Sequence, residues 1–413
     1  MTAQVISLIL RTKERKNMIS FEEAVNITLA NKLQCSTQVA KLENSLGKVL
    51  SADVLCDRDI PPFDKSAVDG YALALGSIGK EAITVSGTIA AGQRPTGTVK
   101  PGECYKIMTG AMVPKGAECV VMVEDTELNG NQLLINRGEK GYSLWSNICL
   151  KGEDLKKGSV LLQKGTIIGP EHIAVLASAG LDEVPVVCYP KLGILSTGDE
   201  LIEPGQPVEE YQIRNSNGWQ LMAQANRAGF ENQYFGIASD SREELENSVS
   251  RALQQCDVLV MTGGVSMGEF DFVPQVLTSQ GFCILFDRVA IQPGKPSTFA
   301  VKEGKVVFAL PGNPVSSFVQ FELLVRPYLA ACAGADYSPL RLRLPLSQDY
   351  TRRNTSRTSL VPVKTEPYGS ICPIIYNGSA HIHAMTCANG IMVVPSGVSG
   401  FKKGDHALTI LLG

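Results

Sequence analysis

The clearest pattern along the chain is an alternation of short apolar runs with amphipathic segments between residues 185 and 335. Apolar, β-branched runs are typical of strands buried on both faces, and amphipathic segments are typical of helices packed on a sheet. The predicted strands cover 192–196, 233–238, 257–261, 284–290 and 306–310, and the predicted helices cover 215–228, 241–253 and 315–330. This alternation predicts a three-layer α/β domain around a parallel sheet.

Polar or glycine-rich loops follow four of these strands. They read TGDE at 197–200, SD at 239–240, TGGVSMGEFD at 262–271 and PGNP at 311–314. Because the carboxyl ends of parallel strands meet at one edge of a sheet, these loops should share one crevice. The charged side chains expected there are Asp199, Glu200, Asp240, Glu269, Asp271 and Lys295. A glycine loop beside carboxylates predicts a site for a phosphate and a bridging metal ion.

The segment from Gly264 to Gly268 also matches G-x-S-x-G, the nucleophile motif of many hydrolases, with Ser266 at its centre. That motif needs a helix that begins directly at the serine, whereas the best helix start here is Asp271. A catalytic histidine would have to come from the carboxyl-terminal region, which holds all histidines after this motif. The Ser266 hydroxyl is therefore better explained as a donor to a phosphate.

The regions on either side of the alternating segment have different patterns. An amphipathic helical pattern begins at Met18, a second helix is predicted near 39–50, and a helix returns at 171–179. Short β-branched runs with many glycines fill 80–150, and short strands recur from Tyr337 onward. Residues 1–17 resemble a leader outside the fold. We predict a helical linker domain (18–54 and 150–184), an inserted β domain (55–149), the α/β domain (185–335) and a carboxyl-terminal β-barrel domain (336–413).

The loop PPFDKSAVDGYA at 61–72 combines two prolines with the polar side chains of Asp64, Ser66 and Asp69. Two interpretations stay open for it. Turn chemistry alone explains polar residues in a rigid loop, because short polar side chains hydrogen-bond to nearby backbone. Alternatively, the loop presents these groups to a ligand.

Length and composition indicate a multidomain globular protein. The chain has 413 residues, of which 44% are hydrophobic and 19% charged, and this length predicts several domains. A formal net charge of −3 and the lack of a long basic run argue against nucleic acid as the main partner. No apolar stretch reaches the roughly 18 residues of a membrane span. We therefore expect neither nucleic acid nor a membrane as partner.

Eleven cysteines are scattered along the chain, and none forms a CxxC pair. Their spacing fits neither zinc ligation nor a disulfide framework. Buried reduced thiols in a cytoplasmic protein are the simpler interpretation. The sequence also lacks the HExxH, Walker A and GxGxxG motifs, which argues against those zinc, nucleotide and dinucleotide sites.

Taken in order, the motifs resemble those of the molybdopterin molybdenumtransferase family, which includes the carboxyl-terminal domain of gephyrin. The matching stretches are PPFDKSAVDGYA, KIMTGAMVPKGAECVVM, LSTGDEL, RNSN, TGGVSMGEFDFV, QPGKP and LPGNPVSSF. They cover roughly residues 18–330, and the terminal domain matches in general pattern only. The resemblance implies a homodimer of four-domain chains, with each site completed across the dimer interface.

The resemblance also implies an activity and a set of site residues. The family takes adenylylated molybdopterin and molybdate and releases AMP, assisted by a divalent metal ion, usually Mg²⁺. Carried over by motif, the functional positions are Asp69, Thr109, Glu200, Asp240, Asp271 and Lys295. Glu200, Asp240 and Asp271 are the expected metal ligands.

Further binding roles follow from the same motifs. The amides of Gly263, Gly264 and Val265, with the Ser266 hydroxyl, are expected to hold substrate phosphates. Lys295 and Arg288 are expected to neutralise molybdate and the pterin phosphate. The loop after the last strand of the sheet is also assigned to substrate binding, through Pro311, Gly312 and Asn313.

Two departures from the family pattern affect the expected anion site. Gln292 stands where many members have Lys, and Lys65 stands where a small amide is common and partly compensates for the missing cation. In the terminal domain, the candidates for an anion-binding arginine are Arg352, Arg353 and Arg357. The sequence leaves molybdate and tungstate equivalent, because both are tetrahedral dianions of similar size.

Two other functions are compatible with the sheet domain. One is a nucleotide-handling enzyme like molybdopterin adenylyltransferase, which lacks the inserted PPFDKSAVDGYA domain. The other is a non-catalytic scaffold, against which the crowded carboxylates argue, since like charges held together cost stability. The resemblance further suggests molybdopterin adenylyltransferase and apo-molybdoenzymes as protein partners.

Overall fold

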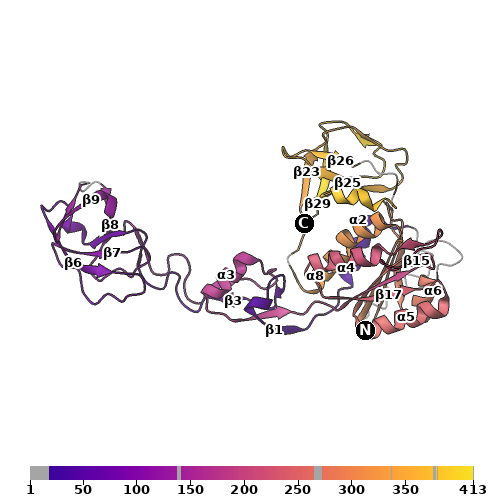
Figure 1. Ribbon diagram of the computed structural model, residues 1–413, viewed down its shortest axis with the longest axis horizontal. Helices are drawn as coiled ribbons and strands as arrows, with labels where there is room; N and C mark the ends of the chain where they lie inside the picture. The colour runs from indigo at the N-terminus through magenta and orange to yellow at the C-terminus, as the bar shows by residue number, and fades with distance from the viewer. Residues whose placement is uncertain are drawn as a thin grey trace. The chain divides into compact units, whose positions relative to one another are not determined.

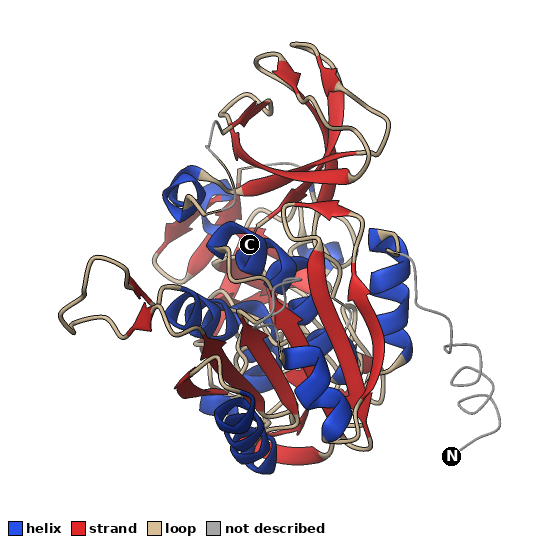
Figure 2. Ribbon diagram, turned by 90° about the vertical axis from the view of Figure 1, so that its right-hand side faces the viewer, coloured by secondary structure: helices blue, strands red, loops and turns tan. Residues whose placement is uncertain are grey.

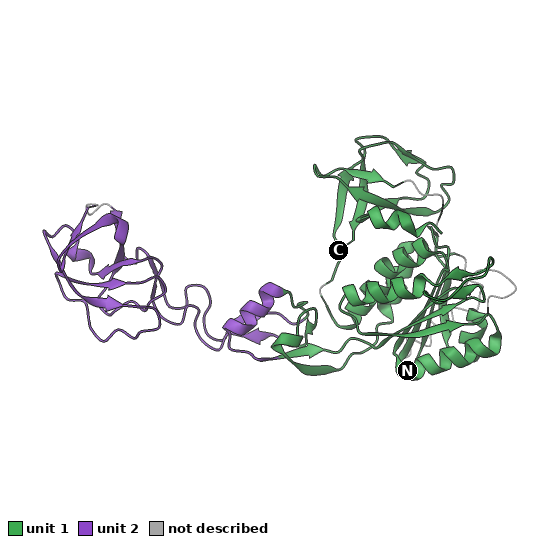
Figure 3. Ribbon diagram, viewed as in Figure 1, with its two compact units in different colours: residues 1–51, 165–169, 184–413 green, residues 52–164, 170–183 purple. Residues whose placement is uncertain are grey.

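The computed structural model describes residues 18–136, 141–264, 272–335, 337–374, 378 and 380–412. The chain divides into two compact units (Figure 3). The first comprises Met1–Ser51, Gly165–Gly169 and Val184–Gly413, and the second comprises Ala52–Lys164 and Pro170–Glu183. The finer division into four domains, with the boundaries given above, remains a prediction.

A six-stranded sheet in the order β17-β14-β18-β22-β21-β19 forms the centre of the first unit. In sequence order its strands are β14 (Leu192–Thr197), β17 (Asn232–Ala238), β18 (Val258–Thr262), β19 (Cys283–Arg288), β21 (Pro296–Lys302) and β22 (Lys305–Leu310). β14 runs parallel to β17 and β18, and β18 runs parallel to β22. The alternating pattern therefore predicted this half of the sheet correctly.

The prediction of a wholly parallel sheet is wrong at the other edge. β21 runs antiparallel to both β22 and β19, so the sheet is mixed. Only Glu303 and Gly304 separate β21 from β22. Two residues suffice for a hairpin, whereas a parallel connection needs a crossover of a dozen residues or more. The connection length therefore dictates an antiparallel strand, and the sequence pattern did not identify β21 as a strand.

Helices cover both faces of this sheet (Figure 1). α4 (Asn217–Arg227), α7 (Pro314–Gln320) and α8 (Arg326–Cys332) lie on one face, and a π-helical turn at Phe321–Val325 joins α7 to α8. α5 (Arg242–Gln255) and α6 (Val273–Ser279) lie on the other face. Successive side chains of β18 point to opposite faces of the sheet. Val260 packs in the hydrophobic cluster that contains Leu221 of α4, and Leu259 packs in the cluster that contains Val249 of α5. The predicted three-layer α/β arrangement is confirmed.

Local signals set where two of the helices begin. α2 (Phe21–Ala30) has Ser20 as N-cap, whose hydroxyl accepts a hydrogen bond from the amide of Glu23 at 3.0 Å. α5 has Ser241 as N-cap, whose hydroxyl accepts one from the amide of Glu244 at 3.3 Å. Both arrangements satisfy a backbone donor that the first helical turn leaves unpaired.

The helix predicted near 39–50 is wrong. This segment forms β1 (Thr37–Lys41), a 3₁₀ turn at Leu42–Asn44 and β2 (Val49–Leu50). Both strands pair with β13 (Glu183–Val187) in a three-stranded sheet. Gly47 has φ 76°, a left-handed conformation that ends a helical run. Pairing with a strand more than 130 residues away therefore overrides the local helical spacing.

The second unit is mainly β structure, as predicted for the inserted segment. Its six-stranded sheet has the order β8-β5-β7-β6-β10-β9. The strands are β5 (Gly70–Leu73), β6 (Ile83–Ile89), β7 (Glu103–Ile107), β8 (Cys119–Met122), β9 (Thr126–Asn129) and β10 (Gln132–Ile135). Two smaller pairs join β3 (Val54–Leu55) to β12 (Val160–Leu162) and β4 (Lys65–Ser66) to β11 (Ile148–Cys149). The predicted helix near 171–179 is confirmed as α3 (Pro170–Ser178).

The carboxyl-terminal segment forms a second β structure within the first unit. Its main sheet has the order β20-β25-β27-β29-β23. The elements are β20 (Ile291–Gln292), β23 (Arg341–Pro345), β24 (Tyr350–Thr351), β25 (Thr358–Thr365), β26 (Ile371–Pro373), a 3₁₀ turn (Ile382–Cys387), β27 (Gly390–Val394), β28 (Gly400–Phe401) and β29 (His406–Leu411). The predicted terminal strands are confirmed, and β20 pairs with β25 to connect this sheet to the α/β part. In the described residues, no helix is long and apolar enough to span a bilayer.

Candidate functional site

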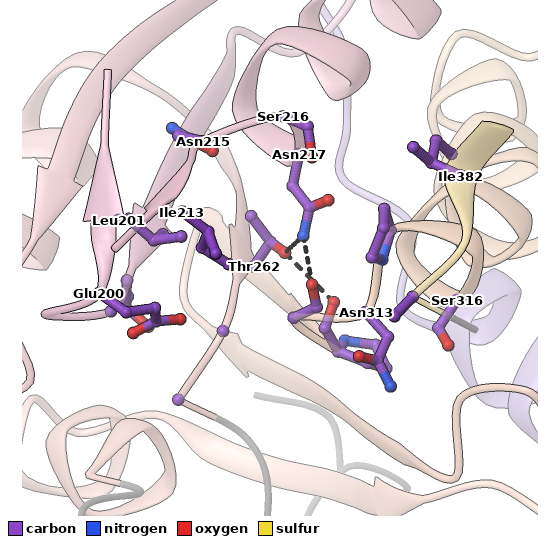
Figure 4. Close-up of a pocket in the computed structure, with 18 of the residues that line it drawn as sticks. Glu200, Leu201, Ile213, Asn215, Ser216, Asn217, Thr262, Asn313, Ser316 and Ile382 are labelled. Atoms are coloured by element: carbon purple, nitrogen blue, oxygen red, sulfur yellow. Dashed lines mark hydrogen bonds between the residues drawn. The ribbon is translucent and has the colours of Figure 1, made fainter. Parts of the chain in front are cut away.

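A cavity of about 710 Å³ lies in the first unit, where the parallel strands of the central sheet end (Figure 4). Thr197 ends β14 and Gly198 follows it, Asp240 follows β17, and Thr262 ends β18. Each of these residues lines the cavity, as does the loop after β22. The predicted convergence of strand-end loops on one crevice therefore agrees with the structure.

Many of the site residues predicted from the sequence line this cavity. They are Glu200, Asp240, Gly263, Gly264, Pro311, Gly312 and Asn313. Val265, Ser266 and Asp271 lie outside the described residues, as does Glu269. The structure thus brings together two of the three predicted metal ligands with the glycine loop and the loop after β22.

The two glycines at the end of β18 have conformations that other residues rarely adopt. Gly263 has φ 99° and Gly264 has φ 60°. A Cβ atom on Gly263 would lie 2.3 Å from the carbonyl oxygen of Thr197, so any side chain there would force β14 and β18 apart. The amide of Gly263 donates to the carbonyl of Leu310 at 3.2 Å, so it is engaged within the sheet. Of the two glycine amides expected to hold phosphate, the geometry therefore favours that of Gly264.

Glu200 and Asp240 bring carboxylates to the cavity from neighbouring strands. The amide of Asp240 donates to Oδ1 of Asp199 at 3.0 Å, which ties the loop after β17 to the loop after β14. A Cβ on Gly198 would lie 2.6 Å from Oε2 of Glu200, so a side chain there would displace that carboxylate. These contacts set the positions of both loops.

The donor set suits a hard, hydrated cation. In the part of the chain that the structure describes, no group of three or more His, Cys, Asp and Glu side chains is arranged to hold a metal ion. Two carboxylates on one cavity still fit Mg²⁺, which usually keeps several water ligands and takes others from substrate phosphates. Glu200 and Asp240 could therefore hold Mg²⁺.

The segment RNSN at 214–217 also lines the cavity, although the sequence motif carried no assigned role. The side-chain nitrogen of Asn217, Nδ2, donates to Oγ1 of Thr262 at 2.9 Å and to the carbonyl of Gly312 at 2.7 Å (Figure 4). The Thr262 hydroxyl in turn donates to the carbonyl of Pro311 at 3.2 Å. Asn217 therefore ties the end of β18 to the loop after β22. Ala380 and Ile382 of the terminal segment complete the lining and had no signal in the sequence.

Lys295 lies in a neighbouring cavity of about 810 Å³ rather than in the first one. Gln292, Asp349 and Arg357 line the same cavity, and the two cavities share Gly294 and Pro296. The Nη1 atom of Arg357 donates to the carbonyl of Ile291 at 3.0 Å. Lys295 and Arg357 therefore supply the cationic groups of the second cavity.

Arg352 has a structural role instead. Its guanidinium donates four hydrogen bonds of 2.6 to 2.8 Å, to the carbonyls of Val398, Arg357 and Pro395 and to the hydroxyl of Ser359. Burial lowers the pKa of Arg352. Arg353 and Arg288 line neither of the two cavities, and Nε of Arg288 lies 3.9 Å from the carboxylate of Asp287. Of the three candidate arginines, the geometry favours Arg357.

Asp69 and Thr109 lie together in the second unit. Oδ1 of Asp69 accepts hydrogen bonds from the amide of Thr109 at 2.7 Å and from its hydroxyl at 3.0 Å. The amide contact is the main reason why the pKa of Asp69 is lowered. The structure therefore pairs these two predicted residues, and their role at a site shared between two chains remains a prediction.

Two other polar groups of the PPFDKSAVDGYA loop bond to backbone, one at a distance along the chain and one within the turn. Oδ1 of Asp64 accepts from the amide of Lys151 at 2.7 Å, and the Ser66 hydroxyl donates to the carbonyl of Val68 at 2.6 Å. Lys65 lines a separate cavity of the second unit, beside Asp59 and Asp154. Turn chemistry thus accounts for Ser66, whereas Asp64 ties the loop to the distant Lys151 backbone.

Comparison with family models matches nearly the whole chain. Residues 19–180 match the MoeA N-terminal region (domain I and II), residues 193–331 match a probable molybdopterin binding domain, and residues 340–412 match the MoeA C-terminal region (domain IV). These matches follow the order of the motifs along the sequence.

Individual relatives give the same result. Molybdopterin molybdenumtransferase of Staphylococcus aureus is 36% identical over 413 residues, which cover 97% of this chain and 96% of that protein. The enzyme of Staphylococcus epidermidis is 34% identical, with 96% of each chain covered. Among solved structures, the molybdopterin biosynthesis moeA protein from Pyrococcus horikoshii OT3 is similar with a TM-score of 0.81 and 29% identity, covering 96% of this chain and 100% of that one. The chain belongs to the molybdopterin molybdenumtransferase family.

Proposed function

We propose that this chain inserts molybdenum into molybdopterin, and that it does so at the cavity where β14, β18 and β22 end. Its substrates would be adenylylated molybdopterin and molybdate, and AMP would leave as the metal enters the dithiolene. The observation that carries the proposal is that Glu200 and Asp240 share one cavity with Gly264 in a chain that matches a molybdopterin molybdenumtransferase over 96% of that protein. Carboxylates beside a glycine loop suit a phosphoanhydride substrate with its cation.

The chain's own residues would first orient the substrate phosphates. The Gly264 amide sits where the strand ends, and Asn217 fixes the adjacent loop. Pro311, Gly312 and Asn313 of that loop also line the cavity. Preorganised backbone donors at such a site favour the charge that develops when the adenylate is cleaved.

Mg²⁺ is part of the proposal as a cofactor held by Glu200 and Asp240, with Asp271 as a third ligand. When bound, it would offset negative charge on the phosphate oxygens. Adenylate cleavage needs a positioned water more than a covalent nucleophile, and the Asp240 carboxylate is suited to orient that water by accepting its hydrogen bond.

Molybdate would bind as a substrate in the second cavity, beside Lys295 and Arg357. The support is that this cavity adjoins the first through Gly294 and Pro296. A lysine and an arginine together balance a tetrahedral dianion, because the acidic lining residue Asp349 is paired with Lys402 at 2.9 Å. Gln292 lines the same cavity without adding charge, so Lys295 and Arg357 would carry the binding.

AMP release from adenylylated molybdopterin tests the proposal, measured with and without molybdate, tungstate and Mg²⁺. We expect AMP release only when both an oxyanion and Mg²⁺ are present. Comparing the rates with molybdate and with tungstate at equal concentration gives the preference between molybdenum and tungsten. Release without an oxyanion would instead indicate a hydrolase of the adenylate, close to a nucleotide-handling enzyme. Binding of adenylylated molybdopterin without any release of AMP would favour a non-catalytic scaffold.

A homodimer with shared sites is also part of the proposal, with Asp69 and Thr109 completing the site of the partner chain. The support is that these two residues form a hydrogen-bonded pair on the surface of the second unit. Mixing inactive Asp69→Ala and Glu200→Ala chains tests it. Random pairing would restore about a quarter of the wild-type activity, because half of the dimers would hold one intact site of two. No recovery after mixing would place both residues in a site within one chain.

A cytoplasmic location is proposed as well, supported by eleven cysteines that are all free thiols. Molybdopterin adenylyltransferase and apo-molybdoenzymes are proposed as partners, because one would supply the adenylylated substrate and the others would accept the product. Cell fractionation tests the location. Co-purification with each partner, compared between the full chain and a chain with a disrupted terminal domain, tests the contacts.

A further inference from the structure

Two chain segments between β14 and α4 form one wall of the first cavity. Gly198, Glu200 and Leu201 belong to the first segment, and 213–217 is the second. Short strands β15 (Leu201–Ile202) and β16 (Ile213–Arg214) pair in parallel where the segments meet. Two-residue strands hold a loop only weakly, so other contacts must set the position of this wall.

Asn215 is the first of those contacts, and it is 1% exposed. Its Oδ1 accepts hydrogen bonds from the Ser196 hydroxyl at 3.2 Å and from the amide of Gly218 at 3.1 Å. The side-chain nitrogen of Asn215, Nδ2, donates to the hydroxyl oxygen of Tyr234 at 2.6 Å. The backbone amide of Gly218 can only donate, so the Asn215 atom that it contacts must be the oxygen Oδ1. This contact fixes the orientation of the Asn215 side chain.

Tyr234 connects this asparagine to the other wall segment. Its hydroxyl donates to Oε1 of Glu203, two residues beyond Leu201. Oε2 of Glu203 accepts from the indole nitrogen of Trp219 at 3.0 Å, and Trp219 belongs to α4. Since Tyr234 already accepts from Asn215, its own proton must go to Glu203. Burial and the contact with Glu203 raise the pKa of Tyr234, which keeps that proton in place.

Gly218 makes room for this arrangement within the first turn of α4. A Cβ there would lie 2.8 Å from Cε2 of Tyr234 and 3.0 Å from the side-chain nitrogen of Asn215. A glycine inside a helix normally costs stability, so a close approach of this kind is the physical reason for its presence. The network is therefore packed as well as hydrogen-bonded.

We propose that Tyr234 is a positioning residue for the transferase reaction, because its hydroxyl joins the two wall segments that hold Glu200 and Asn217 in the cavity. This inference rests on the proposed function. Tyr234 does not line the cavity and so does not touch the substrate. It acts through Glu203, three residues from Glu200, and through Asn215, two residues from Asn217.

The test is Tyr234→Phe, which removes both hydrogen bonds and keeps the ring. We expect the Mg²⁺ concentration for half-maximal activity and the KM for adenylylated molybdopterin each to rise about tenfold, with a smaller fall in kcat. Amide exchange at 213–217 should become faster, which reports on the wall without any activity. Tyr211→Phe is the matched control. Tyr211 lies between β15 and β16, in the same part of the chain, but its side chain is 75% exposed.

A second variant keeps the inference testable if Tyr234→Phe folds poorly. Trp219→Phe removes only the indole donor to Glu203 and should show the same changes to a lesser degree. Wild-type amide exchange at 213–217 in a folded Tyr234→Phe protein would overturn the positioning role, as would unchanged KM and Mg²⁺ dependence. Absence of AMP release from the wild-type chain would instead overturn the proposed function, and the exchange measurement distinguishes the two failures.

Discussion

Single residues at the strand ends decide whether the cavity can exist. Gly263 lies where β18 approaches β14 so closely that a side chain would overlap the backbone of Thr197. The side chain of Asn217 donates to the Thr262 hydroxyl at the end of β18 and to the Gly312 carbonyl in the loop after β22. These residues act through shape and hydrogen bonding, whereas Glu200 and Asp240 supply charge to the same cavity.

Gly263→Ala should destabilise the first unit by on the order of 2 kcal/mol or more and abolish AMP release. The physical reasons are the φ of 99° and the overlap with the Thr197 carbonyl oxygen. Gly304→Ala is the matched control. It also has a positive φ, of 69°, but a Cβ there would meet no atom within 4 Å. An equal decrease of the thermal unfolding temperature in both variants would contradict the role of the close contact between Gly263 and Thr197.

Asp69 should titrate at a lower pH than an ordinary aspartate, because the amide and hydroxyl of Thr109 donate to its charged form. A lowered folded-state pKa gives stability that is present above the unfolded pKa and is lost as the pH falls through the folded value. Thr109→Val removes the hydroxyl but keeps the amide, so the pKa of Asp69 should rise only part of the way. Carboxyl chemical shifts followed by NMR measure this, and an unshifted pKa in the wild-type chain would refute it.

At the scale of elements, one buried carboxylate holds three helical segments together. Glu322, in the π-helical turn between α7 and α8, is 3% exposed. It accepts from Arg227 at 2.5 Å, from Arg326 at 3.0 Å and from the side-chain nitrogen of Gln224 at 2.7 Å. Two of these donors lie on α4, so the contacts fix α4 beside the helix that follows β22.

Glu322→Ala should lower the free energy of unfolding of the first unit by roughly 3 to 5 kcal/mol, because it leaves two guanidinium groups without their carboxylate. Arg227→Ala should cost much less, since that side chain is 43% exposed and water can replace its contact. Urea denaturation of both variants measures the difference. Equal losses in the two variants would argue that the carboxylate matters only through the Arg227 pair.

At the scale of the molecule, the terminal sheet and the α/β part share one core. The cluster that contains Val260 and Phe308 of the central sheet also contains Leu360 and Ile391 of the terminal sheet. The second unit has separate clusters of its own, one of them around Leu133. This distribution of contacts predicts which parts of the chain unfold together.

Ile391→Ala should therefore lower the unfolding transition of the whole first unit, by about 2 to 4 kcal/mol for a buried large-to-small change. Leu133→Ala, equally buried, should affect only the transition of the second unit. Differential scanning calorimetry with tryptophan fluorescence separates the transitions. A terminal sheet that melts alone in the Ile391→Ala variant would contradict the shared core.

Much of the architecture was predictable from local patterns. Strand and helix periods identified β14, β17, β18 and β22, together with α4, α5 and the helical segment after β22. The convergence of strand-end loops followed because parallel order fixes which ends meet. Where a short connection or a distant strand decided the outcome, as at β21 and at β1 and β2, the local pattern was insufficient.

The sequence by itself determined the alternation of elements, the glycines and carboxylates at the strand ends, and the motifs that identify the family. Only the tertiary structure decided that the Gly263 amide is engaged, that Lys295 lines a neighbouring cavity, and that Tyr234 joins the two segments of the wall. The physical reason is that period and capping act over a few residues. A hydrogen-bond partner or a cavity wall depends on residues far apart in the chain, whose meeting is set by packing.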